Sequence, residues 1–410
     1  MKKKANARKG HPDYVVMLTV AGLTVVGLML VYSATFDWSY QVYGNSFHIA
    51  LRQFRWVGLG VVGLVVFTFV PYEWWRKAAV PVMGATLAAL LLVLIVGQKR
   101  FGAQRSFFDG SIHPGELAKL SVIIYIAAWL SSKGEQIRDL TYGLIPFAVL
   151  IGVVAGLIVA QPDIGTAILI CVTAVAVFFF AGADVLQLAV GGAIGAVPFA
   201  LLVSNFPYAS DRIAEWLQVW RSPELAGHHM KQSLIALGSG GLFGVGLGQG
   251  QQKLGYLPTH HTDAIFAVLG EEAGLLGCLI VVGLFVLFAY RGFKITMEAR
   301  DPFAALLACG VTCLITFQAL LNVGVVTGLV PFTGMALPFI SSGGSSMLVS
   351  LAGVGVLLGV SRGRDVSEGR RAKGTKQEGD RQYAHLDRRR GYRGTRLSRT
   401  RGRAGAQRRR

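Results

Sequence analysis

The sequence predicts an all-α, polytopic integral membrane protein with about ten transmembrane helices. Of its 410 residues, 53% are hydrophobic, and the mean hydropathy of +0.51 is far above that of soluble domains. Apolar runs of about 20 residues recur, and each can cross a hydrocarbon core of about 30 Å. These runs lack the strict alternation of a membrane β-barrel.

We expect a short basic N-terminus (1–13), a transmembrane domain (14–362) and a polar tail (363–410). The N-terminus lacks a small-residue cleavage site, so the first span is a retained helix rather than a signal peptide. The sixth and seventh spans are separated by a Gly-Ala-Asp turn, which leaves a re-entrant hairpin open as an alternative. The ten spans have approximate limits of 14–33, 54–71, 78–97, 114–131, 143–160, 164–181, 184–204, 263–290, 302–329 and 335–360.

The distribution of basic residues predicts the orientation. Thirty of the 40 Lys and Arg residues lie on the side of the N-terminus, nine lie on the opposite side and one, Lys119, lies within a span. Because positive loops stay in the cytoplasm, both termini are predicted to be cytoplasmic. The long loop 205–262 is therefore predicted to be extracytoplasmic.

The tail is predicted to be disordered, because it has few large apolar residues and 18 basic residues follow residue 361. Two interpretations remain open: attraction to anionic lipid or an acidic partner, and a solubilising positive tail. Nucleic-acid binding is not expected, since only Tyr383 and Tyr392 could stack on bases.

The long loop contains two recognisable segments. Residues 211–221 have the pattern of an amphipathic helix in the membrane interface, with Trp216 and Trp220 as anchors. Residues 232–248 are rich in glycine but have no preceding strand and no acidic ribose partner, which argues against a dinucleotide fold. Their glycines instead suggest a close approach of backbone to helices or ligand.

Asp263 lies where this loop re-enters the membrane, and two roles compete for it. As a helix cap it would be stabilised by the helix dipole. As a functional group it would be a base or ligand held at the outer membrane surface. Glu271 and Glu272 lie eight and nine residues further on, so they point about 80° and 180° away from it on a helix. Neither is an obvious catalytic partner.

Other polar residues stand at the outer ends of spans. Glu116 and Lys119 are three apart and share a helix face; they either form a structural ion pair or line a pocket where a cation could meet pyrophosphate. Arg52 could contact lipid phosphate or an anionic substrate. Asp163 is predicted to be a helix cap. Residues 331–347, broken by proline and glycine and rich in serine, predict unwound backbone that lines a cavity or is buried.

No closed metal site is expected. The four cysteines lie in apolar runs and are predicted to form neither disulfides nor metal sites. His228, His229, His260 and His261 do not match a zinc spacing. A divalent cation, Mg²⁺ or Mn²⁺, that bridges Asp263 and a pyrophosphate is left open.

Five motifs resemble the SEDS family, the RodA and FtsW proteins of bacterial wall synthesis, over about residues 14–362. The Gly270-Glu-Glu motif and the Gln-Lys-Leu before Tyr256 look closer to the division branch, FtsW. The matching motifs are Pro114-Gly-Glu-Leu-Ala-Lys119, Gln161-Pro-Asp-Ile-Gly-Thr166, Gln232-Ser-Leu-Ile-Ala-Leu-Gly-Ser-Gly-Gly241, Tyr256-Leu-Pro-Thr-His-His-Thr-Asp263 and Pro338-Phe-Ile-Ser-Ser-Gly-Gly-Ser-Ser346.

The resemblance implies a peptidoglycan glycosyltransferase of the bacterial plasma (inner) membrane that polymerises lipid II. Asp263 matches the family's essential aspartate and would be the general base. The expected partners are a class B penicillin-binding protein and other division-complex membrane proteins. A lipid II flippase, an elongation-type polymerase and a non-catalytic scaffold remain alternatives. The residues expected to bind substrate or support the site are Glu116, Lys119, Arg52, Gln232, Ser233, His261, Thr262 and Ser345.

Overall fold

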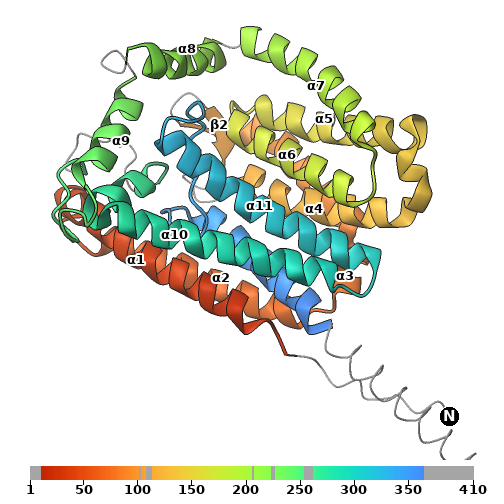
Figure 1. Ribbon diagram of the computed structural model, residues 1–410, viewed down its shortest axis with the longest axis horizontal. Helices are drawn as coiled ribbons and strands as arrows, with labels where there is room; N and C mark the ends of the chain where they lie inside the picture. The colour runs from red at the N-terminus through yellow and green to blue at the C-terminus, as the bar shows by residue number, and fades with distance from the viewer. Residues whose placement is uncertain are drawn as a thin grey trace, which may run out of the picture.

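The structure is a computed structural model that describes residues 11–100, 103–107, 113–205, 207–222, 227–253 and 262–363. The segments 1–10 and 364–410 of the predicted termini lie outside these residues. Helices dominate the described chain (Figure 1). They are α1 (Tyr14–Tyr43), α2 (His48–Phe69), α3 (Tyr72–Val96), α4 (Pro114–Lys133), α5 (Ile145–Val159), α6 (Ile164–Phe180), α7 (Val185–Asn205), α8 (Pro207–Arg221), α9 (His228–Ser239), α10 (Ile265–Met297), α11 (Pro302–Val326) and an unlabelled final helix (Gly344–Gly363).

The predicted membrane fold is confirmed. Among the described residues, eight helices are long and apolar enough to cross a membrane, and Ile164–Phe180 and Val185–Val197 are shorter apolar helices. Together they equal the ten predicted spans in number, but α1 continues to Tyr43 beyond the predicted end at residue 33. The final helix begins at Gly344 rather than at the predicted residue 335. The α7 helix runs for 21 residues, which is the length of a full crossing. The length of α7 favours two separate spans over a re-entrant hairpin at residues 164–205.

The bundle has two ends, which we name by what they carry. The loop end holds α8, α9 and residues 327–343, whereas the terminal end holds Asp13 and residues 361–363. Figure 1 shows α8 and α9 toward one end and the start of α1 toward the other.

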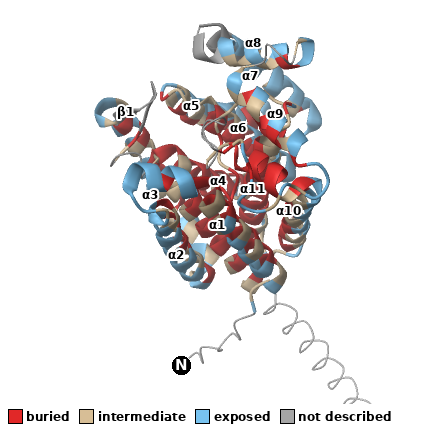
Figure 2. Cartoon of the chain, turned by 90° about the vertical axis from the view of Figure 1, so that its left-hand side faces the viewer, coloured by how far each residue is buried: buried red, intermediate tan, exposed pale blue. Residues whose placement is uncertain are grey.

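The core lies around α11, which packs against α10, α6 and α4. With the final helix, α11 is the most deeply buried of the long spans, while α2 and α3 face outward (Figure 2). Glycines allow the final helix to lie close against α2, because a Cβ on Gly355 would stand 2.5 Å from the carbonyl oxygen of Leu64. This close packing is the form of helix association expected where lipid replaces water.

Helix α10 is broken at Gly274, a feature that the sequence did not predict. Gly274 has φ 66° and ψ −167°, a conformation open to glycine but not helical. Residues 241–246 fill the break: the N–H groups of Val245 and Gly246 donate to the carbonyls of Glu271 and Glu272 at 3.0 and 3.1 Å. In return, Leu275 and Leu276 donate to the carbonyls of residues 241 and 242 at 2.9 and 3.2 Å. The broken helix therefore keeps its hydrogen bonds.

Two further segments depart from regular helix. Strands β1 (Gln98–Arg100) and β2 (Ala103–Ser106) form an antiparallel hairpin between α3 and α4 that the sequence did not predict. Residues 331–343 contain no helix, as predicted for this segment. Many of its residues are buried, including Phe339 and Ile340, so its backbone is covered by protein.

Polar contacts close the terminal end. The Asp13 carboxylate caps α1 by accepting from the N–H groups of Val15 and Val16 at 3.1 and 3.2 Å. It also pairs with Arg291 of α10 at 2.5 Å, and its own N–H donates to Ser361 at 3.2 Å. Arg362 donates to the carbonyl of Thr68 at 2.9 Å. The helices α1, α2, α10 and the final helix are thereby tied together.

Candidate active site

Asp263 lies at the loop end, immediately before α10. The helix begins at Ile265 with Ala264 at the N-cap position, and Ala264 makes no side-chain cap hydrogen bond. The position that the cap interpretation assigned to Asp263 is thus held by another residue. The carboxylate lies beside Gly334, where a Cβ would stand 3.4 Å from its Oδ2. Asp263 is half-buried, so it contacts protein and remains partly exposed.

A buried amide holds the backbone of Asp263 in place. The Nδ2 group of Asn322, on α11, donates to the carbonyl of Asp263 at 2.8 Å and to the carbonyl of Met335 at 2.7 Å. One side chain therefore joins the approach to α10 with the unwound segment 331–343. Because Asn322 is almost fully buried, these hydrogen bonds are protected from water.

Ser341 makes a second connection between the same two segments. Its hydroxyl accepts from the N–H of Leu337 at 2.7 Å and donates to the carbonyl of Thr262 at 2.6 Å. The carbonyl of Ser341 in turn accepts from Nε2 of Gln53 on α2 at 3.3 Å. Thr262, a predicted site residue, thus contributes its backbone to the site. We call residues 262–263 and 331–343, joined by the hydrogen bonds of Asn322 and Ser341, the frame of the site.

The Glu116–Lys119 pair is linked to this frame through Gln318 of α11. Its two charged groups are 2.6 Å apart, and the Lys119 ammonium also donates to Oε1 of Gln318 at 3.0 Å. Gln318 passes the connection on, since its Nε2 donates to the carbonyl of Ala336 at 2.8 Å. Lys119 is only 2% exposed, so its ammonium braces α4 against α11 rather than facing the surface.

The helices α8 and α9 close over residues 328–332. Arg212 donates to the carbonyl of Phe332 at 2.7 Å, with its guanidinium 4.7 Å from that ring. The ring of His229 lies 4.2 Å from the same phenyl ring. Burial, with the charges of Arg212 and His228, lowers the pKa of His229 to about 4, so this ring is neutral at pH 7. The contact is therefore an aromatic one with no charge on the histidine.

One predicted interface anchor has a different role. Nε1 of Trp216 donates to the carbonyl of Gly328 at 3.0 Å, so this ring packs on the protein rather than on lipid. Trp220 remains exposed. The reason is that α8 packs on α9 and on residues 328–332, which takes one face of the helix away from the membrane.

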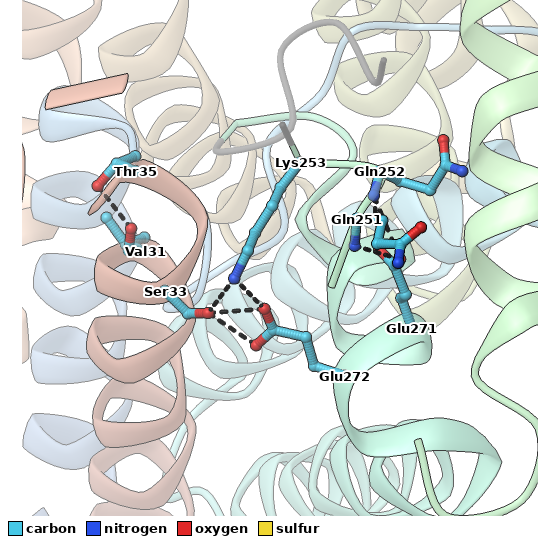
Figure 3. Close-up of polar contacts among 8 residues, drawn as sticks. All are labelled: Val31, Ser33, Thr35, Gln251, Gln252, Lys253, Glu271 and Glu272. Atoms are coloured by element: carbon cyan, nitrogen blue, oxygen red, sulfur yellow. Dashed lines mark hydrogen bonds and ion pairs between the residues drawn. The ribbon is translucent and has the colours of Figure 1, made fainter. Parts of the chain in front are cut away.

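Glu271 and Glu272, which are not obvious catalytic partners of Asp263, hold the end of the long loop. Figure 3 shows Glu272 paired with Lys253 and Ser33, and Glu271 facing Gln251 and Gln252. The Lys253 ammonium lies 2.6 Å from Glu272 and 3.0 Å from the Ser33 hydroxyl of α1. Glu271 accepts from the N–H of residue 251 at 2.7 Å. Both carboxylates are used to fix the chain ten residues before Asp263.

The remaining predicted residues take varied positions. Arg52 is exposed on α2, while its buried neighbour Gln53 makes the contact to Ser341. The Ser233 hydroxyl donates to the carbonyl of His229 within α9 at 2.9 Å. Gln232 and Ser345 are half-buried. His261 lies outside the described residues, as do the motif residues 256–260. Asp163 caps α6 by accepting from Thr166 at 3.2 Å, as predicted.

Three supporting residues were missed by the sequence reasoning: Gln53, Gln318 and Asn322. The available signal was a polar amide inside an apolar span, since Gln318 and Asn322 lie four residues apart on one face of α11. Among the described residues, no three His, Cys, Asp or Glu side chains converge as a metal site. The divalent cation that the sequence left open therefore gains no donor set among these residues.

The fold and the site define a polytopic membrane protein with a framed carboxylate at one end of its helix bundle. The family model described as "Cell cycle protein" (FtsW, RodA and SpoVE) matches residues 14–365, and the chain belongs to this family. It is 39% identical to stage V sporulation protein E of Bacillus subtilis over 359 residues, covering 87% of this chain and 98% of that one. It is 35% identical to a probable peptidoglycan glycosyltransferase FtsW of Escherichia coli, covering 84% of this chain and 85% of that one.

Solved structures show the same fold. A structure titled "Structural coordination of polymerization and crosslinking by a peptidoglycan synthase complex" contains a chain that matches with a TM-score of 0.72 and 29% identity, covering 86% of this chain and 98% of that one. RodA of Thermus thermophilus matches with a TM-score of 0.64 and 30% identity, covering 86% and 97%. These agreements confirm the SEDS resemblance that the motifs indicated.

Proposed function

We propose that this protein is a peptidoglycan glycosyltransferase that polymerises lipid II into β-1,4-linked glycan for the septal wall of dividing bacteria. The observation that carries the proposal is the framed position of Asp263. Its backbone is fixed by Asn322, and its neighbour Thr262 is fixed by Ser341. Asp263 itself is half-buried and lies at the loop end. Relatives named as probable peptidoglycan glycosyltransferases support the reaction class.

The chemistry follows from the placement of the base. Asp263 takes the proton of the 4-hydroxyl of the acceptor N-acetylglucosamine as the oxygen attacks C1 of the donor N-acetylmuramic acid. The bond from C1 to the pyrophosphate breaks, undecaprenyl pyrophosphate leaves, and the α-linkage is inverted to β. A general base of this kind contributes about 10²–10⁴-fold to the rate.

The surrounding residues position the base rather than react. Asn322, Gln318 and Ser341 hold backbone carbonyls by neutral hydrogen bonds, which keeps the carboxylate in one place at little electrostatic cost. The Glu116–Lys119 pair supports Gln318 from the inside of the bundle. Arg52, Gln232, His261 and Ser345 are proposed as substrate-binding or supporting residues on the strength of their motifs alone.

The reaction requires the loop end to face outward from the plasma membrane, with both termini cytoplasmic. The distribution of the basic residues supports this orientation. Cysteines introduced at positions 224 and 375 test it with an impermeant maleimide applied to intact cells. Position 224 is expected to react and position 375 to stay protected; the reverse pattern would reject both the orientation and the mechanism.

The proposed partner is a class B penicillin-binding protein, which crosslinks the new glycan. This pairing is supported by the similar structure of a peptidoglycan synthase complex, whose title names the coordination of polymerization and crosslinking. The decisive experiment incubates purified, reconstituted protein with labelled lipid II, with and without the cognate penicillin-binding protein. Glycan ladders on a gel are expected, and their absence under both conditions would refute the polymerase assignment.

A lipid II flippase is less well supported. Transport would need a polar path to the terminal end, but there Asp13, Arg291 and Arg362 are engaged in contacts between helices. The buried charges Lys119, Lys253 and Glu272 lie instead toward the loop end. The same reconstituted vesicles separate the two functions, since a flippase would move labelled lipid II between leaflets without forming glycan.

A further inference from the structure

Residues 242–247 carry large apolar side chains that are exposed in the described part of the chain. Leu242, Phe243 and Leu247 are 63%, 79% and 61% exposed. The segment belongs to the glycine-rich run of the long loop and fills the break in α10. Nothing in the catalytic frame around Asp263 uses these three side chains, so their exposure calls for a separate explanation.

The exposed side chains continue an apolar stripe on α10. Leu275, Leu276 and Leu279 follow the break, and each is more than half exposed. The N–H groups of Leu275 and Leu276 donate to the carbonyls of residues 241 and 242, which places the loop segment directly beside this stripe. A stripe of this kind on a membrane-spanning helix faces lipid.

The depth of the segment follows from the length of α10. No charged residue occurs between Gly274 and Arg291, and the path from Gly274 to Lys294 is about 30 Å at about 1.5 Å per residue. This distance equals the thickness of the hydrocarbon core. With Arg291 and Lys294 at one boundary, the break at Gly274 lies at the other, together with residues 242–247.

The backbone of the segment can enter this region because its polar groups are satisfied. Irregular backbone is excluded from lipid where its N–H and C=O groups lack partners. Here the segment and the broken helix exchange four hydrogen bonds, and Gly244 donates to the carbonyl of Gly240 at 2.7 Å. The fit requires glycine, because a Cβ on Gly244 would stand 2.1 Å from the carbonyl oxygen of Glu272.

We propose that residues 242–247 form an interfacial anchor that inserts Leu242, Phe243 and Leu247 among the lipid acyl chains at the loop end. The anchor is linked to the site, because Glu271 and Lys253–Glu272 hold the chain that follows it (Figure 3). It thereby sets the depth of the site relative to the bilayer. The inference does not depend on the reaction proposed for Asp263.

The test is a depth measurement by electron paramagnetic resonance. The four native cysteines are replaced by alanine, and a spin label is attached at Phe243→Cys or, separately, at Leu247→Cys. The full-length protein is placed in nanodiscs of phosphatidylethanolamine and phosphatidylglycerol without any partner. Leu279→Cys serves as the lipid-facing control, and the exposed Ser132→Cys near the end of α4 serves as the aqueous control.

We expect labels at both loop positions to collide with dissolved oxygen several-fold more than with the water-soluble nickel complex, as at position 279. Preferential collision with nickel, as at position 132, would overturn the proposal by placing the segment in water. Protection from both reagents would also overturn it, because it would mean that a second copy or another part of the chain covers the segment.

Discussion

The two ends of the helix bundle are both closed by polar side chains, but in different ways. At the terminal end, charges meet charges and helix ends: Asp13 pairs with Arg291 and caps α1. The loop end also holds two ion pairs, formed by Lys119 and Lys253, but there the amides of Asn322 and Gln318 and the hydroxyl of Ser341 bind carbonyls of irregular backbone. The first pattern joins regular helices, whereas the second shapes a backbone that no helix would form.

This difference separates stability from function within one core. The terminal end resembles ordinary capping, so its contacts contribute to the free energy of unfolding. At the loop end, buried hydrogen bonds fix the backbone geometry around the carboxylate of Asp263. Substitutions at the loop end should therefore lower activity beyond any loss of folded protein, and substitutions at the terminal end should not.

The largest effect is expected for Asp263→Asn. The amide keeps the size of the side chain but cannot accept the proton at neutral pH. Polymerisation should fall by about 10²–10⁴-fold, while the melting temperature and the binding of lipid II change little. The measurement is the length of glycan made at matched protein levels. Long glycan from this variant would mean that the base lies elsewhere.

Asn322→Ala should give the next largest effect. It leaves the carbonyls of Asp263 and Met335 without their donor, at a cost of roughly 1–3 kcal/mol for each buried group. Displacement of Asp263 by about 1 Å should lower activity by about 10²-fold. Thr312→Ala on the same helix is the matched control, because among the described residues its hydroxyl donates to the carbonyl of Ala308 within α11. Equal activities of the two variants, per folded molecule, would contradict the framing role.

Glu116→Ala tests whether the Glu116–Lys119 pair supports the frame through Gln318. It leaves the buried Lys119 ammonium hydrogen-bonded to Gln318 but without its charge partner, and breaking such a pair costs about 3–5 kcal/mol. The double variant Glu116→Ala/Lys119→Met should melt at a higher temperature than the single variant. Thermal unfolding and polymerisation are measured together. A single variant with full activity at normal expression would show the pair to be a bystander.

Arg291→Gln at the terminal end should have the smallest effect on activity. Loss of the charged contact to Asp13 should lower stability by roughly 1.5–3 kcal/mol, seen as a lower melting temperature. The polymerisation rate per folded molecule should remain that of the wild type. A rate loss as large as that of Asn322→Ala would break the proposed division between the two ends.

The sequence was sufficient for the spans because their signal is local. Long apolar runs between polar loops gave ten crossings, and proline and glycine marked the unwound segment 331–343. The break at Gly274 was missed because it lies inside an apolar run and is stabilised by a segment about 30 residues earlier. The β1–β2 hairpin was missed because Gln98–Arg100 is polar and too short to show alternation.

Apart from the family motifs, only the charged members of the candidate site could be proposed from the sequence, because their signal is also local. Asp263, Glu116 and Lys119 were found because a charge at a membrane boundary is costly and conspicuous. Asn322 and Gln318 carry no charge, so their importance emerges only when α11 brings them to carbonyls near residues 263 and 335. Arg52 was chosen over Gln53 for the same reason, although the neutral neighbour makes the buried contact.

The order of the chain in this frame has a consequence for how the protein matures during synthesis. Asn322 and Ser341, which fix the carbonyls of residues 263 and 262, are translated about 60 and 80 residues after them. The apolar run 275–290 can enter the membrane on its own, but Asp263 reaches its final position only when α11 and residues 331–341 have followed. A chain that ends before Asn322 therefore lacks both hydrogen bonds that hold these two carbonyls.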